Sequence, residues 1–159
     1  MSTSIVATVD PARGRVDART DRGQLIAMDA DPPEGDDSAA GPKEALLAAL
    51  AGCTAMDVAA ILRKKRQRAE TYEIAVSAES EAEHPRVFTT IKVEHRVSGD
   101  VEAEALRRSI ELSSTRYCPV NAMLSKSVTI EHWYRLTRGD GASSEAMVSV
   151  IGPSGHRVL

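Results

Sequence analysis

The chain has 159 residues, of which 42% are hydrophobic and 27% charged, and its formal net charge is −3. This length suits one domain with a substantial hydrophobic core, and the composition is typical of a soluble globular protein. The slightly acidic charge gives no electrostatic basis for binding nucleic acid or an anionic membrane. Aromatic residues make up only 3% of the chain, so we expect a core of Ala, Val, Leu, Ile and Met.

The N-terminal half of the chain predicts a three-stranded β-meander followed by a long helix. Breaker residues separate three short segments of β-type pattern, at residues 4–9, 15–20 and 24–29. After a loop rich in Pro, Gly and Asp, Pro42 suits the first turn of a helix that should run to about residue 68. This helix is apolar almost all round as far as Leu62, so most of it should be buried.

The C-terminal half predicts two strands, a broken helix and a further strand. We expect strands at residues 72–79 and 86–97, a helix at 102–112 that breaks at 113–115 and resumes over 119–126, and a strand at 128–137. The order βββ-α-ββ-α-β indicates a single α+β domain over residues 1–137. Residues 138–159 form a Gly- and Ser-rich extension, for which both an added strand and disorder remain open.

Nothing in the sequence directs the protein to a membrane or out of the cell. We expect no membrane span, because no apolar stretch reaches the roughly 18 residues that a span needs. Residues 1–10 lack the positive start and apolar core of a signal peptide. We therefore expect a cytoplasmic protein. Structural disulfides are rare in the cytoplasm, so a cysteine pair there favours transient chemistry.

The two cysteines, Cys53 and Cys118, lie in different local settings. Because Pro119 follows it, Cys118 should occupy the start of a helix, where free N–H groups and the positive end of the helix dipole stabilise a thiolate. Cys53 lies in mid-helix without that help, and Asp57, one turn later, would oppose its ionisation. Free cysteines also serve as small buried hydrophobes. A redox pair and two packing residues are therefore both open from these residues alone.

Glu44 and the histidines are the other residues that could take part in a site. Glu44 lies on nearly the same helical face as Cys53 but about 13 Å along the axis, so it can act on the thiol only through another group such as an arginine. The four histidines show no metal-ligand spacing, and we expect them to be solvated or packed. We expect neither a metal nor a cofactor.

Three stretches of the sequence resemble the OsmC/Ohr family. They are the segment at residues 41–57, which contains GCTAMD around Cys53, the segment RYCPVNAML at residues 116–124, and PRVFT at residues 85–89. The resemblance covers about residues 3–136 and includes the βββ-α-ββ-α-β order. GCTAMD followed by ILRKKR resembles the OsmC-like branch more than the organic-hydroperoxide-resistance branch.

The resemblance implies an intertwined homodimer with central apolar helices and a thiol-dependent peroxidase site at the subunit interface. It implies that Cys53 attacks an organic hydroperoxide and becomes a sulfenic acid. Cys118 then condenses with it to a disulfide, which a dithiol reductant, often lipoyl-linked, reduces. The assignment of the attack to Cys53 disagrees with the dipole argument, and we follow the family because a nearby arginine can outweigh a dipole.

In better-known members an arginine from the N-terminal strands, held by a glutamate at the start of the first helix, stabilises the thiolate. By resemblance we expect Arg13 in this role, with Arg15 and Arg19 as rivals, and Glu44 as the glutamate. Glu44 stands one residue later than the family's glutamate, whose place Lys43 takes. The predicted site residues are therefore Cys53, Cys118, Arg13 and Glu44.

These observations support two hypotheses. The first is a cytoplasmic dithiol peroxidase that reduces organic hydroperoxides in oxidative stress defence, with a homodimer, the peroxide and a dithiol reductant as its partners. The second is a non-catalytic OsmC-like dimer that binds a hydrophobic small molecule or senses oxidation through its thiols. Turnover with a dithiol distinguishes them, because a sensor is oxidised once and stops.

Overall fold

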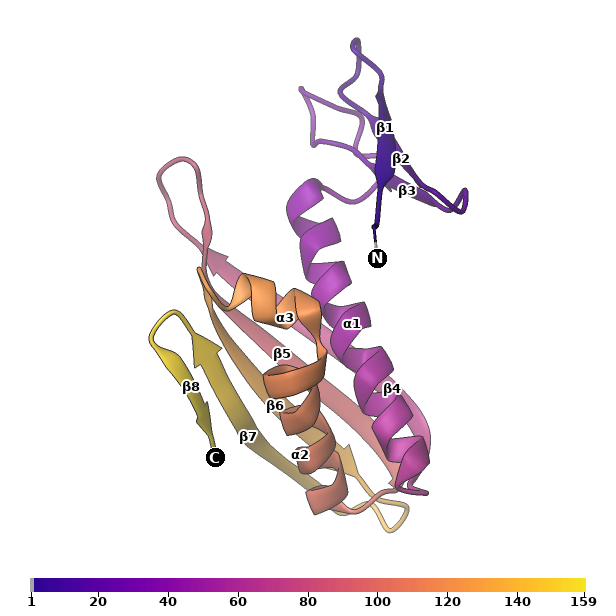
Figure 1. Ribbon diagram of the computed structural model, residues 1–159, viewed down its shortest axis with the longest axis vertical. Coiled ribbons are helices and arrows are strands. Elements are labelled where there is room, and N and C mark those ends of the chain that lie inside the picture. Colours follow the sequence, from indigo (N-terminus) through magenta and orange to yellow (C-terminus); the bar gives the residue numbers. More distant parts are fainter. Residues whose placement is uncertain (1) are drawn as a thin grey trace. The chain divides into compact units, whose positions relative to one another are not determined.

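The computed structural model describes residues 2–159 and shows an α+β protein (Figure 1). Within these residues the chain forms eight β-strands, three α-helices and one π-helical turn. It divides into two compact units, the second of which begins at Ala49. The expectation of a single domain over residues 1–137, with an extension after it, stays a prediction, and each unit is described by itself below.

The first unit is the predicted three-stranded meander. Its antiparallel sheet has the order β1-β2-β3, with β1 at Ile5–Val9, β2 at Val16–Thr20 and β3 at Leu25–Met28. Gly23 makes the turn between β2 and β3, where its N–H donates to Thr20 and its φ of 84° is the left-handed conformation that glycine tolerates. The loop after β3 is fixed by Asp29, whose carboxylate accepts the backbone N–H of Ser38 at 2.9 Å.

Helix α1, Pro42–Lys64, begins where proline predicts and ends earlier than predicted. Glu44 caps its start by accepting the N–H of Gly41 at 2.8 Å. At its end Arg66 takes the left-handed conformation with φ of 58°, and two backbone bonds, Gln67 N–H to Leu62 and Arg66 N–H to Arg63, close a Schellman motif. The predicted end at residue 68 was wrong because such a cap normally uses glycine, and an arginine gives no such signal.

The second unit contains a five-stranded sheet of order β4-β5-β6-β7-β8. These strands are β4 Arg68–Ser80, β5 Phe88–Asp100, β6 Thr129–Thr137, β7 Ser143–Gly152 and β8 Gly155–Val158. Strands β5 and β6 pair in parallel, and the other pairs are antiparallel. In the extension, for which a strand and disorder were both open, the structure forms β7 and β8, and β7 pairs directly with β6.

The helices of the second unit cover one face of this sheet (Figure 1). They are the part of α1 after Ala48, α2 at Ala103–Leu112, the π-helical turn η1 at Ser113–Tyr117 and α3 at Pro119–Leu124. Successive side chains along β5 and β6 point to opposite faces of the sheet. Those on the face covered by the helices are buried, and they include Ile91, Val93, Ile130 and Leu136. The opposite face carries polar side chains, among them the ion-paired Arg96.

Within the second unit α1 buries one stripe only. Leu50, Thr54, Val58 and Leu62, each four residues apart, are buried. The opposite stripe of Ala49, Gly52, Met56 and Ala60 is exposed, and the side chain of Met56 is 71% exposed. The expectation that most of this helix is buried is therefore wrong for a single chain.

Helix α1 is also long and apolar enough to cross a membrane, judged by length and composition alone. Of its most apolar 18-residue stretch, 22% is buried. The expectation that no stretch of the chain reaches that length was therefore wrong. The core helix of a soluble protein passes the same test, so this feature is weak evidence for a membrane span.

The core of the second unit joins the helices to β5, β6 and β7. It contains Val58 and Leu62 from α1, Leu106 and Ile110 from α2, and Val97, Leu136 and Val148 from the sheet. We expect Leu136→Ala to lower the free energy of unfolding by about 2–5 kcal/mol, because a fully buried leucine leaves a cavity when truncated. Urea denaturation followed by circular dichroism measures it.

The matched control is Arg135→Ala, one residue earlier on the polar face of β6. Its ion pairs with Glu94 and Glu145 are partly exposed, so the cost should be at most about 1 kcal/mol. Equal losses in the two variants would contradict this assignment of the two faces of the sheet.

Candidate functional site

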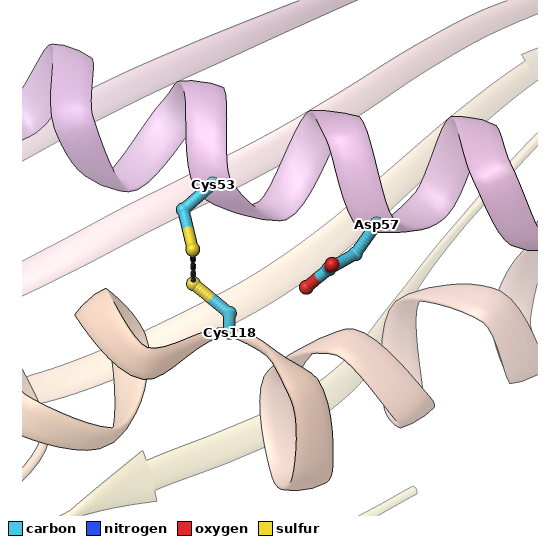
Figure 2. A group of neighbouring side chains, drawn as sticks. All are labelled: Cys53, Asp57 and Cys118. Carbon is cyan, nitrogen blue, oxygen red and sulfur yellow. Dashed lines mark hydrogen bonds between the residues drawn. The ribbon is translucent and has the colours of Figure 1, made fainter. Parts of the chain in front are cut away.

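The fold brings the two cysteines, 65 residues apart in sequence, into direct contact (Figure 2). Both are free thiols, and the thiol of Cys118 donates a hydrogen bond to the sulfur of Cys53 with 2.6 Å between the sulfur atoms. Cys53 is half-buried on α1, whereas Cys118 is only 2% exposed. The two sulfur atoms therefore form one site in which each thiol lies within reach of the other.

The position of Cys118 follows from the way α2 ends. Helix α2 passes into η1, whose last bond runs from the N–H of Cys118 to the carbonyl of Ser113 at 2.9 Å. Cys118 itself is extended, and Pro119 starts α3. The sulfur of Cys118 accepts the N–H of Asn121 at 3.3 Å, so Cys118 is the N-cap residue of α3, at the helix start that the sequence predicted.

Burial nevertheless makes Cys118 a weak acid. Desolvation, and after it the hydrogen bond to Cys53, raise the pKa of the Cys118 thiol to about 12, against the lowering effect of the N–H groups of Asn121 and Val120. The expectation that the helix start makes Cys118 the more acidic thiol was therefore wrong. At neutral pH Cys118 keeps its proton and donates it toward the sulfur of Cys53.

A carboxylate completes the cluster. Asp57, one turn after Cys53 on α1, has a carboxylate oxygen within 4.8 Å of both sulfur atoms (Figure 2). It accepts a hydrogen bond from the hydroxyl of Ser113 at 3.0 Å. Asp57 also contributes, after burial, to raising the pKa of Tyr72. Asp57 therefore lies beside the thiols, and its opposition to the ionisation of Cys53 stays a prediction.

Cys53, Asp57 and Cys118 together offer three potential metal ligands. Two thiolates bound to one tetrahedral zinc ion, with Zn–S bonds of about 2.3 Å, lie about 3.8 Å apart. The sulfur atoms here are 2.6 Å apart, so the thiols would have to separate before both could bind zinc. The observed geometry suits sulfur–sulfur chemistry better than metal binding.

Buried polar residues below the thiols were missed as functional candidates from the sequence. Asn121 and His132 are fully buried and hydrogen-bonded to each other at 2.9 Å, and His95 is fully buried beside them. The expectation that histidines are packed holds for His95 and His132. Their places on the apolar faces of two strands were the available signal, because a polar side chain there needs a partner.

The predicted activating residues lie in the first unit. Arg13 forms an exposed ion pair with Asp36 at 3.0 Å, and Arg15 pairs with Asp17 at 3.2 Å. Glu44 accepts the N–H of Gly41.

The expected pair, in which Glu44 holds Arg13, is not formed within the described residues: Arg13 is paired with Asp36, and Glu44 is bonded to Gly41. The roles of Arg13, of its rivals Arg15 and Arg19, and of Glu44 toward Cys53 stay predictions.

Comparison with known proteins places this chain in a family. A family model described as OsmC-like protein matches residues 35–132. Protein YhfA of Escherichia coli K12 is 39% identical over 115 residues, which cover 72% of this chain and 84% of YhfA.

Solved structures share the fold. An OsmC-like protein from Mycoplasma pneumoniae aligns with a TM-score of 0.74 at 19% identity, covering 86% of this chain and 97% of that chain. A Legionella pneumophila protein described as an organic hydroperoxide resistance protein OsmC aligns with a TM-score of 0.61 at 16% identity, covering 81% of this chain and 94% of that chain. At such identities these structures show the fold alone. The match of the family model over more than half of the chain and the identity with YhfA show that the chain belongs to the OsmC-like family.

Proposed function

We propose that the protein is a thiol-dependent peroxidase that reduces organic hydroperoxides in oxidative stress defence. The observation that carries this proposal is the contact of 2.6 Å between the sulfur atoms of Cys53 and Cys118, with the proton held on Cys118. A peroxidase of this kind needs one thiol that attacks and a second that reaches the oxidised sulfur without moving far. The contact between the two cysteines supports this proposal, with Cys53 as the attacking thiol and Cys118 as the second.

The reaction divides into two balanced steps. The Cys53 thiolate attacks the terminal oxygen of the hydroperoxide, the O–O bond breaks, and the alkoxide takes a proton and leaves as an alcohol, so that Cys53 becomes a sulfenic acid. The sulfur of Cys118 then attacks the sulfur of Cys53, which releases the hydroxyl as water with the proton from Cys118. An external dithiol, for which we propose a lipoyl-linked one, reduces the disulfide by exchange and is itself oxidised.

The surroundings of the thiols support an organic rather than an inorganic peroxide. Cys53 lies on a helix rich in alanine and leucine, and the neighbouring exposed stripe of α1 is apolar. The hydroperoxide resistance description of the Legionella relative points the same way. A cytoplasmic location, where dithiol reductants are kept reduced, belongs to the same proposal.

A second candidate function is a redox sensor or a binding protein for a hydrophobic small molecule. It is favoured by two interactions in the first unit: the ion pair of Arg13 with Asp36 and the hydrogen bond that Glu44 accepts from the N–H of Gly41. A thiol without an arginine partner reacts with peroxide slowly, which suits a sensor that responds once.

We also propose a homodimer built on α1. The exposed stripe of Ala49, Gly52, Met56 and Ala60 is apolar and, apart from Met56, consists of small residues. A Cβ added at Gly52 would meet no atom within 4 Å, so this face of the helix is open in a single chain. The same stripe on a second copy could approach closely and shield both from water.

Steady-state turnover tests the peroxidase directly. We expect continuous consumption of cumene hydroperoxide with dihydrolipoamide as reductant, measured by the loss of the dithiol. Cys53→Ser should abolish it, because the attacking sulfur is gone. Without the reductant, Cys118→Ser should consume about one equivalent of peroxide per chain and end as a sulfenic acid, because the chain has no second thiol with which to form a disulfide. Wild-type protein that is oxidised once and then stops would support the sensor instead.

Asp57→Asn tests the electrostatics of the site. The substitution removes a negative charge within 4.8 Å of the thiols but keeps an oxygen for the Ser113 hydroxyl. In a Cys118→Ser background we expect alkylation of Cys53 by iodoacetamide at pH 7 to accelerate about three- to tenfold, because a like charge no longer opposes the thiolate. Asp57→Glu, which keeps the charge, is the control. An unchanged or slower rate in Asp57→Asn would contradict the assigned role.

The oligomeric state tests the proposed dimer. Light scattering should give the mass of a dimer at micromolar concentration, and Met56→Glu should give a monomer, because it places a charge on the apolar stripe. Thr137→Glu, at an exposed position of β6, should remain dimeric. A wild-type monomer would rule out both the dimer and any site shared between subunits.

A further inference from the structure

A chain of buried polar groups leads from Cys118 into the core of the second unit. The backbone N–H of Asn121 donates to the sulfur of Cys118 at 3.3 Å. The side chain of Asn121 donates through Nδ2 to the carbonyl of Ser114 at 2.7 Å, and its Oδ1 lies 2.9 Å from Nε2 of His132. Asn121 is therefore held on both sides of its amide and in turn holds Cys118.

These contacts determine where the proton of His132 lies. Nδ2 of Asn121 is a donor, since it faces a carbonyl, so Oδ1 must be an acceptor and Nε2 of His132 must carry a proton. Burial lowers the pKa of His132 to about 4, so the ring is neutral at pH 7. Nδ1 of His132 is then an unprotonated nitrogen, and within the described residues it has no hydrogen-bond partner.

The bare Nδ1 of His132, like Nε2 of His95, which is equally unpartnered among the described residues, is a cost that a histidine in the core carries. An unsatisfied buried nitrogen costs free energy, and an apolar side chain of similar volume on β6 would avoid that cost. What the histidine provides is the Nε2–H bond to Asn121. Neighbouring His95 is equally buried, and its ring stacks at 5.9 Å from that of His132, but it bonds to Tyr72 rather than to Asn121.

We propose that His132 is a positioning residue for the second thiol: through Asn121 it fixes the N-terminal turn of α3 so that the sulfur of Cys118 stays in contact with that of Cys53. This proposal rests on the proposed function in assigning the second step to Cys118. The step depends on geometry, because a displacement of about 1 Å in a reacting group can slow a reaction as much as a hundredfold. His132 is required for the attack of Cys118 on oxidised Cys53 and not for the first oxidation of Cys53.

A reaction without peroxide isolates this step. The Cys53 thiolate attacks dithiodipyridine, which breaks the reagent's S–S bond, forms a mixed disulfide on Cys53 and releases one thiopyridone. Cys118 then loses its proton to solvent and attacks the sulfur of Cys53, which releases a second thiopyridone and forms the Cys53–Cys118 disulfide. Absorbance shows two phases, of which only the first depends on reagent concentration.

We expect His132→Leu to slow the second phase by about tenfold or more while the first phase changes by less than about threefold. His132→Gln, whose amide N–H can replace Nε2–H, should restore the second phase to within about threefold of the wild-type rate. His95→Phe, which replaces an equally buried histidine without a bond to Asn121, should leave the second phase near the wild-type rate. Circular dichroism and the melting temperature establish that each variant is folded.

Equal slowing of the second phase in His132→Leu, His132→Gln and His95→Phe would overturn the proposal, as would an unchanged second phase in His132→Leu. If His132→Leu does not fold, His132→Asn takes its place, since its shorter amide does not reach Asn121, and the same comparison with His132→Gln decides. The test does not use peroxide. Normal second-phase behaviour in a protein that fails to turn over cumene hydroperoxide would therefore reject the peroxidase and keep the positioning role.

Discussion

The hydrogen bond from the thiol of Cys118 to the sulfur of Cys53 is the contact on which the proposed chemistry depends, and the packed elements around it hold the two sulfur atoms in place. One sulfur is carried by a long regular helix and the other by an irregular segment, where η1 ends α2 and Pro119 starts α3. Both supports pack on the same face of one sheet, so the contact does not depend on a flexible loop. A site built on packed elements holds its geometry more closely than one built on loops.

The distribution of protons at this contact shows that burial outweighs the helix start. Cys118 is at the N-cap of α3, and its sulfur accepts an N–H from Asn121, both of which favour a thiolate. Helix α3 has only six residues, however, and Cys118 is 2% exposed, so desolvation dominates and raises the pKa of its thiol. In the proposed reaction a protonated second thiol does not compete with Cys53 for peroxide, and it brings the proton for the water that leaves when the disulfide forms.

Much of the fold could be predicted because its signals are local, and what was missed depends on long-range contacts or rare conformations. Alternation along β5 and the proline that starts α3 identified both elements to within a few residues. The end of α1 depends on Arg66 in a left-handed conformation, which arginine does not signal. The bond between Asn121 on α3 and His132 on β6 joins a helix to a strand, and no periodicity within either element predicts such a bond.

Asp57 places a negative charge beside the two thiols, which bears on how Cys53 becomes a thiolate. Its carboxylate lies within 4.8 Å of both sulfur atoms, and a like charge at that range disfavours a neighbouring thiolate, which a nearby positive charge offsets. The expected source is an arginine of the first unit, and Arg13 is held there by Asp36 in a pair whose side chains are 67% and 55% exposed. Such an exposed pair contributes at most about 1 kcal/mol, whereas a cation near a half-buried thiolate typically shifts its pKa by one unit or more, about 1.4 kcal/mol. Because the Arg13–Asp36 pair is the weaker of these two interactions, it favours the sensor only as long as no cation reaches Cys53.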